Sequence, residues 1–177
     1  MAYGGMRPLL SRSRRTMRAL AVCLALASSA LAAEGPSIAL AGLGGRSHTV
    51  VVADLEKLPV REINVADPHS KEPARYRGVA LSAVLGLVEA PLGEALRGKA
   101  LASHVQVEAA DGYSVAFSLA ELDAGLGSTD AVVAFERDGK PLGGDLGSFR
   151  LVVPTDKRGA RWVRQVVKIS IVEASRP

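Results

Sequence analysis

The residues of this sequence best suited to chemistry are basic side chains near its C-terminal end. Arg150 lies in an apolar segment, and Lys157, Arg161 and Arg164 follow it within fourteen positions. Arginine offers forked donors that match phosphate and carboxylate, and lysine offers a point charge for the same groups. The spacing leaves two interpretations open: a cradle for an anionic ligand, or a solvated loop whose charges pair with nearby carboxylates such as Asp156.

Other kinds of chemistry have weaker support. The histidines His48, His69 and His104 lack the close spacing of zinc ligands, so we expect no metal site. The only cysteine is Cys23, and no serine lies in a G-x-S-x-G pattern, so a thiol or serine nucleophile is not expected after residue 23.

The N-terminal segment has the features of a signal peptide. Arginines at 7, 12, 14, 15 and 18 precede an apolar run, Ala19 to Leu31, and small residues stand at Ala30 and Ala32. We expect cleavage after Ala32, which leaves 33–177 as a single domain in the periplasm or secreted. No later stretch has the roughly 20 apolar residues of a membrane span, so no membrane insertion is expected after cleavage.

The export route and the charge depend on this segment. Residues 13–17, "SRRTM", resemble a twin-arginine signal, but Met17 offers an alternative start that would leave an ordinary secretory signal. Cleavage removes five arginines and no acidic residue, so 17 basic and 18 acidic residues remain and the net charge becomes −1. Binding of nucleic acid therefore loses its electrostatic basis.

The elements that must position the basic residues are mostly strands. Hydrophobic alternation and β-branched runs predict strands at 47–52, 60–65, 104–109, 113–117, 131–137, 149–153 and 165–172. Short helices are predicted at 55–58, capped by Asp54, and at 79–88, and Ser118 to Glu121 fits a capping box. The polar stretch 66–78 is predicted to be an exposed loop, and "GLGGRS" at 42–47 a flexible lead-in. The fold class is α+β with mixed sheets.

Four blocks of the sequence resemble the molybdopterin-binding domain of the sulfite oxidase family. They are "YRGVALSAVL" at 76–85, the segment 105–122, "DGKPL" at 138–142 and "FRLVVPTDKRGARWVRQVVKISI" at 149–171. Each block alone is weak, but their order and spacing follow the family over nearly all of the mature chain. The resemblance implies an α+β domain that holds a molybdenum-pterin cofactor through basic side chains.

The resemblance assigns roles to individual residues. Arg150 falls on the arginine of the family's "PlRlvvP" segment, and Arg161 with Trp162 on its "KW" pair. In an enzyme of this kind, Arg150, Lys157, Arg161 and Arg164 would neutralise the cofactor's phosphate, and Tyr113 would line the pocket.

The sequence also departs from the family pattern. Catalytic members bind molybdenum through a cysteine near the loop that here reads "VADPHSKEPARYRG", at 65–78, and this loop has none. A thiolate is a natural partner for such a metal, and nothing replaces it here. Catalytic members also carry a histidine shortly before the matched arginine, where this chain reads "GGDLGSFR".

Two functions follow as hypotheses. The first is an exported, non-catalytic binding module without a cofactor, whose cleft, lined by Arg150, Arg161 and Arg77, binds a small anion or a membrane sensor's periplasmic domain. The second is a periplasmic molybdopterin-dependent oxidoreductase that carries a molybdenum-pterin cofactor. The missing cysteine favours the first, and the sequence leaves the ligand, the partner and the oligomeric state open.

Overall fold

The fold is seen in a computed structural model that describes Met1 and residues 35–68, 70–127 and 129–174 of the 177-residue chain. From Gly35 onward the chain clusters as one compact unit. The rest of the predicted signal peptide and His69 lie outside the described residues. The predicted boundary after Ala32 therefore stays a prediction.

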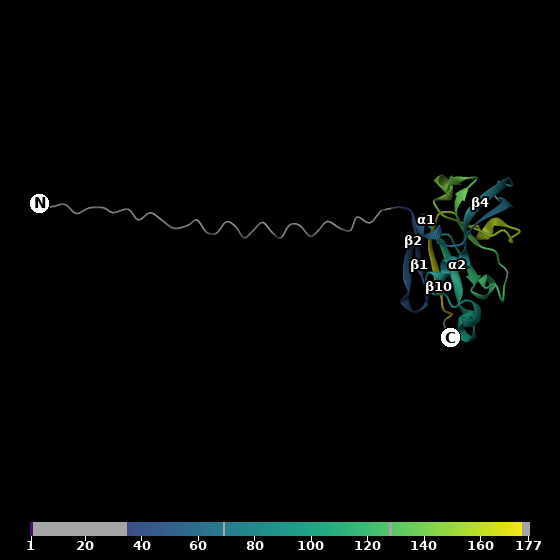
Figure 1. The fold of residues 1–177 in the computed structure, drawn as a ribbon, viewed down its shortest axis with the longest axis horizontal. Coiled ribbons are helices and arrows are strands. Elements are labelled where there is room, and N and C mark those ends of the chain that lie inside the picture. The colour runs from purple at the N-terminus through teal and green to yellow at the C-terminus, as the bar shows by residue number, and fades with distance from the viewer. Residues whose placement is uncertain (2–34, 69, 128, 175–177) are drawn as a thin grey trace. The chain divides into compact units, whose positions relative to one another are not determined.

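The first sheet joins strands from both ends of the unit (Figure 1). Its order is β2 (Ser47–Val51), β1 (Ser37–Ala41), β10 (Val166–Val172), β5 (His104–Ala109) and β6 (Ser114–Ser118). β1 runs parallel to β10, and the other neighbours are antiparallel. This sheet is therefore mixed.

The second sheet is antiparallel throughout its described pairings. Its order is β3 (Val60–Ala66), β4 (Pro73–Ala80), β7 (Val132–Arg137) and β8 (Lys140–Pro141), and β9 (Arg150–Val152) also pairs with β7. Every residue of β9 is buried, so Arg150 enters the interior together with its apolar neighbours.

Helices are short and connect the strands. They are α1 (Val52–Leu55) and α2 (Leu81–Gly86), with 3-10 turns η1 (Leu43–Gly45), η2 (Gly93–Ala95), η3 (Gly98–Ala102), η4 (Ala120–Leu122), η5 (Gly144–Leu146) and η6 (Gly159–Arg161). Among the described residues, no helix has both the length and the apolar character needed to cross a bilayer. Two sheets with a few short helices confirm the α+β fold class.

The predicted strands agree closely with the structure, because each has a buried face that the pattern reveals. All seven predicted strands are present with ends within one residue of the expected positions. In β5, for example, Val105, Val107 and Ala109 are buried and alternate with half-buried polar residues. The backbone N–H of Ser118 donates to Glu121 at 2.8 Å, the contact expected from the capping-box pattern.

The predicted loop at 66–78 is wrong over most of its length. β4 begins at Pro73, where the missing N–H of proline costs no bond within the strand, and only residues 67–72 connect it to β3. Ala74 and Tyr76 point into the core, while Arg75 and Arg77 lie on the opposite face. The strand was not predicted because charged residues occupy its exposed face and make the segment resemble a polar loop.

Three other predictions need correction. The segment 42–47 is a tight connection between β1 and β2, in which the Gly42 N–H donates to the Arg46 carbonyl at 2.8 Å, and not a flexible lead-in. α1 begins at Val52, so Asp54 lies inside the helix, where its carboxylate accepts the Val51 N–H. The helix predicted at 79–88 is confined to Leu81–Gly86, because β4 continues through Ala80.

Candidate functional site

Arg150 is held by a carboxylate inside the fold. Its side chain is 1% exposed, and its Nη1 donates to Asp67 Oδ2 at 2.7 Å. The Tyr76 hydroxyl donates to the same oxygen at 2.8 Å. Because a buried cation needs a compensating charge, the Asp67 carboxylate makes Arg150 a structural residue of the interior.

Aromatic rings complete this buried cluster. The Arg150 guanidinium lies 5.4 Å from the Tyr76 ring centre and 5.3 Å from that of Trp162, at distances typical of cation–π contacts. The two rings meet edge to face at 6.1 Å. Burial, and then the hydrogen bond to Asp67, raise the pKa of Tyr76 from 10.0 to about 12, so this phenol stays neutral.

Trp162 also lines a pocket of about 400 Å³. We call it the Trp162 pocket, and its lining residues are Pro68, Ala109, Asp111, Tyr113, Gly159, Ala160, Trp162 and Arg164. The turn after β5 and the segment around η6 are tied together here, because the Tyr113 hydroxyl donates to the Ala160 carbonyl at 2.6 Å. Asp111 accepts the Tyr113 N–H at 2.9 Å, which shapes the turn.

The predicted site residues separate into two groups. Tyr113 and Arg164 line the Trp162 pocket, whereas Arg150 does not. Arg164 is exposed and, among the described residues, has no carboxylate within 4.0 Å. Lys157 is also exposed and unpaired within the described part of the chain, on the loop that leads into η6. Arg164 is therefore the cation placed to meet a ligand in the pocket.

Arg161 and Arg77 are engaged elsewhere in ion pairs. Arg161 makes a two-pronged contact with Asp156, at 2.8 and 2.7 Å, and a further contact with Glu121 at 3.2 Å. The hydrogen bonds to Asp156 raise the pKa of Arg161 above its usual value. Arg77 pairs with Glu136 at 3.0 Å and Glu56 at 3.2 Å.

These contacts correct the predicted cleft. None of the pockets found among the described residues is lined by Arg150, Arg161 or Arg77, and each of these arginines pairs with a carboxylate of the chain. The alternative interpretation of the basic run, charges paired with nearby carboxylates, is confirmed for Arg161 and its partner Asp156.

Two parts of the site were not found from the sequence. Asp67 lies 83 positions from Arg150, and no local pattern connects them. Pro68, in the connection between β3 and β4, lines the Trp162 pocket and was not among the predicted site residues. The contact of Asp67 with Arg150, and the position of the neighbouring Pro68 at the pocket, become visible only in the tertiary structure.

The donor set of the Trp162 pocket does not fit a thiolate-bound molybdenum centre. It offers one guanidinium, one phenol, one carboxylate and backbone groups, and the sequence after Cys23 contains no thiol. In the ranges that the structure describes, no three His, Cys, Asp or Glu side chains are grouped to hold a metal ion. A small anion fits better, because Arg164 lines the pocket and, among the described residues, forms no ion pair within 4.0 Å.

Comparison with known proteins gives a fold relative. The crystal structure of the sulfane dehydrogenase SoxCD from Paracoccus pantotrophus is similar with a TM-score of 0.57 and 20% sequence identity, over 76% of this chain and 37% of the other. This chain thus spans little more than a third of that structure's chain. A search of curated proteins gives no match.

The fold and the order of its elements define an α+β domain of the sulfite oxidase type. The family model of the oxidoreductase molybdopterin binding domain matches residues 54–177. The chain belongs to this family, as the four sequence blocks predicted.

Proposed function

We propose that the protein is a non-catalytic module of its family that binds a small oxyanion in the Trp162 pocket. The observation that carries the proposal is the position of Arg164, which lines the pocket with no carboxylate within 4.0 Å in the described part of the chain. Arg150 and Arg161, two other arginines of the basic run, already pair with carboxylates of the chain.

The chemistry of the pocket supports binding more than turnover. Arg164 supplies charge and forked donors, and the ring of Trp162 forms an apolar wall beside it. Tyr113 donates its hydroxyl proton to the Ala160 carbonyl, a bond within the chain that shapes the pocket. Asp111 is likewise committed to the turn.

Export and partner belong to the same proposal. The signal-like segment 1–32 supports a periplasmic or secreted protein, and the sequence after it contains no run long enough for a membrane span. A non-catalytic module acts by being recognised, so the periplasmic domain of a membrane sensor is the partner that we propose. We propose no cofactor for this form.

The alternative function is a molybdopterin-dependent oxidoreductase in the periplasm. The family match over 54–177 favours it, since this domain binds molybdopterin. Tyr113 and Arg164 would then hold the pterin's polar end from the same pocket. The cofactor would supply the redox chemistry, and the metal would need a ligand from outside the described residues.

The first experiment separates these functions. Mature protein is isolated from its own exporting cell, molybdenum is measured by elemental mass spectrometry, and pterin by the fluorescence of its oxidised form. We expect neither. Near-stoichiometric molybdenum and pterin would overturn the binding-module proposal.

The second experiment tests the pocket. Inorganic phosphate and sulfate are titrated into the mature protein by calorimetry, and we expect Arg164→Gln to weaken binding by about tenfold or more, the loss of a charge-assisted hydrogen bond. The matched control is Arg97→Gln, because Arg97 is also exposed and lies outside the pocket. An equal loss in both variants would mean that only general charge is involved and would refute the site.

A further inference from the structure

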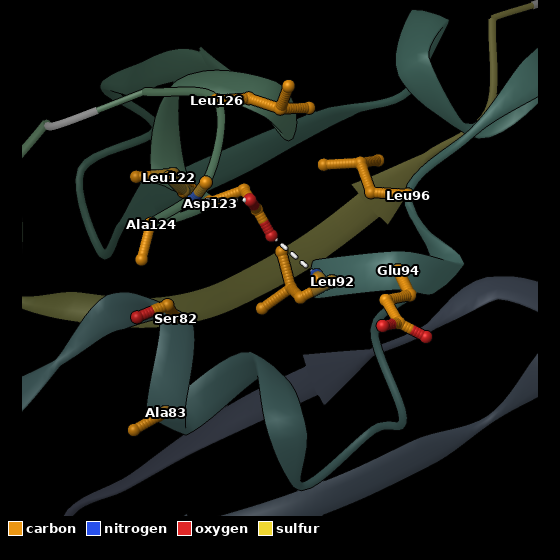
Figure 2. A pocket seen from close by; sticks show the side chains of 11 residues that line it. Ser82, Ala83, Leu92, Glu94, Leu96, Leu122, Asp123, Ala124 and Leu126 are labelled. Atoms are coloured by element: carbon orange, nitrogen blue, oxygen red, sulfur yellow. Dashed lines mark hydrogen bonds between the residues drawn. The ribbon is translucent and has the colours of Figure 1, made fainter.

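A second, larger pocket lies among α2, η2 and the loop after η4. Its volume is about 760 Å³, within the range of roughly 300 to 1,000 Å³ of ligand pockets. We call it the leucine pocket after Leu92, Leu96, Leu122 and Leu126 in its wall. Figure 2 shows the loop with Leu122 and Ala124 facing the segment with Leu92 and Glu94. It shares no lining residue with the Trp162 pocket.

Asp123 fixes the two walls of the leucine pocket relative to each other. Its side chain comes from one wall and accepts the backbone N–H of Gly93 from the other, the contact dashed in Figure 2. It also accepts the Gly125 N–H of its own loop at 2.8 Å. These hydrogen bonds, chiefly the one from Gly93, hold the pKa of Asp123 below 3.8, so its carboxylate stays charged. The two walls are thus joined in the absence of a ligand.

The charges around the leucine pocket have one sign. Glu94 lines it, is exposed, and has no basic group within 4.0 Å in the part of the chain that the structure describes. No lysine or arginine is among the lining residues. An apolar anion, such as a fatty acid, would meet two carboxylates here, whereas an apolar group beside a positive charge is complementary to the pocket.

The apolar wall of the pocket continues to an exposed rim at Leu126. Leu126 is 62% exposed, whereas Leu96 and Leu122 in the wall are 5% and 7% exposed. A small molecule inside the pocket would contact Leu126 but would leave much of its exposed side chain in water. A segment of another protein covers the wall and the rim together.

We propose that the leucine pocket docks an extended segment of a partner protein, which inserts a leucine or phenylalanine side chain and places a lysine or arginine next to Glu94. The apolar side chain fills the space between the leucines, and the basic residue compensates the lone carboxylate at the rim. The inference stands apart from the anion-binding function, because it concerns different residues.

Three labelled peptides test the proposal by fluorescence anisotropy with the mature protein. The first is acetyl-Gly-Leu-Phe-Lys-Lys-Gly-amide, the second replaces both lysines by glutamate, and the third replaces leucine and phenylalanine by serine. We expect the first to bind, the second to bind about tenfold more weakly, and the third not to bind measurably. Octylamine is titrated alongside as a small apolar cation.

Variants of the protein locate the site. Leu126→Asp should weaken the first peptide about tenfold, and Glu94→Gln should reduce the preference for the lysine peptide over the glutamate peptide. The matched control is Leu101→Asp, because Leu101 is 45% exposed and does not line the pocket. The control should bind as the unchanged protein does, and thermal unfolding verifies that each variant is folded.

Several results would overturn this proposal. These are an affinity that is the same for all three peptides, an equal effect of Leu126→Asp and Leu101→Asp, and binding of octylamine without binding of any peptide. The last result would make the leucine pocket a small-molecule site. None of them affects the titration of phosphate or sulfate at Arg164, so the two proposals fail independently.

Discussion

The interior of this protein contains an arginine whose main role is electrostatic and structural. Arg150 is surrounded by Asp67, Tyr76 and Trp162, so its charge is compensated and its faces are covered by rings. Arg137 Nη1 also lies 3.8 Å from the Asp67 carboxylate. Trp162 is shared with the Trp162 pocket, so the buried pair supports one wall of the proposed anion site.

Removing the carboxylate of this pair should be costly. We expect Asp67→Ala to lower the free energy of unfolding by about 3 to 5 kcal/mol, because Arg150 then stays buried without its anion. Urea denaturation followed by tryptophan fluorescence measures the change. Asp54→Ala is the control, since its ion pair with Lys57 is exposed to solvent and should contribute much less. A similar small change for Asp67→Ala would contradict a structural role of the pair.

Tyr76 gives the cluster an alkaline limit. Its pKa is about 12 in the folded protein and 10.0 ordinarily, so its contribution to stability is complete below pH 10 and is lost as the pH rises towards 12. Between about pH 9 and about pH 11.5, the free energy of unfolding should therefore decrease more for the unchanged protein than for Tyr76→Phe. Parallel losses in both proteins would show that Tyr76 does not titrate differently on folding.

At the scale of residues, the sequence predicted an ion pair between residues close together in the chain but not one between distant residues. Asp156 was expected as a partner for the basic run and lies five positions from Arg161. Asp67 was not expected, because its contact with Arg150 spans 83 positions and depends on how β9 packs. The pocket residues Tyr113 and Arg164 were predicted from the family resemblance, but their meeting in one pocket needed the structure.

At the scale of elements, β4 and β7 approach each other closely at Gly78. The register between β4 and β7 shifts between Arg77 and Gly78, and a Cβ on Gly78 would lie 2.3 Å from the Val133 carbonyl oxygen. Only a residue without a side chain allows the two backbones to approach this closely.

Gly78→Ala should therefore destabilise the fold by about 1 to 3 kcal/mol, the usual effect of overpacking. Gly86→Ala is the matched control, because nothing lies within 4 Å of its added Cβ and alanine favours a helix. Thermal unfolding of both variants gives the comparison. If Gly78→Ala melts at or above the temperature of Gly86→Ala, the close approach of β4 and β7 is wrong.

The link between η2 and the loop after η4 should weaken in acid. The pKa of Asp123 is lowered, chiefly by the Gly93 N–H, so its contribution to stability is present above pH 3.8 and is lost as the pH falls through the lowered value. We expect Asp123→Asn to unfold at a lower temperature than the unchanged protein at neutral pH, with the gap narrowing in acid. A gap independent of pH would show that the charge of Asp123 is not involved.

At the scale of the whole molecule, we propose that the N-terminal segment is removed by a signal peptidase. Mature protein recovered from the periplasm or medium should begin at Ala33, and Ala32→Arg should leave the precursor uncleaved, because signal peptidase requires small residues there. Intact mass and N-terminal sequencing measure both. A mature chain that begins at Met1 would contradict the proposed export signal.

The α+β class and the family were predictable because they depend on the order of many elements. The strand pattern repeats a buried and an exposed face, and the four blocks appear in the family's order. β1 was missed because its short run, Ser37–Ala41, precedes a glycine-rich segment that reads as a lead-in. Its parallel partner, β10, is far from β1 in the sequence, so no local sequence pattern includes both strands.

This parallel pair also sets an order for biosynthesis. β10 is the last described strand in the chain and stands between β1 and β5, in the middle of the first sheet. Until residues 166–172 have been synthesised, β1 and β2 form a hairpin without the neighbour that joins them to β5. Long-range pairings of this kind slow folding. The β1–β2 hairpin therefore waits for β10, and chains interrupted before β10 expose an unpaired strand edge.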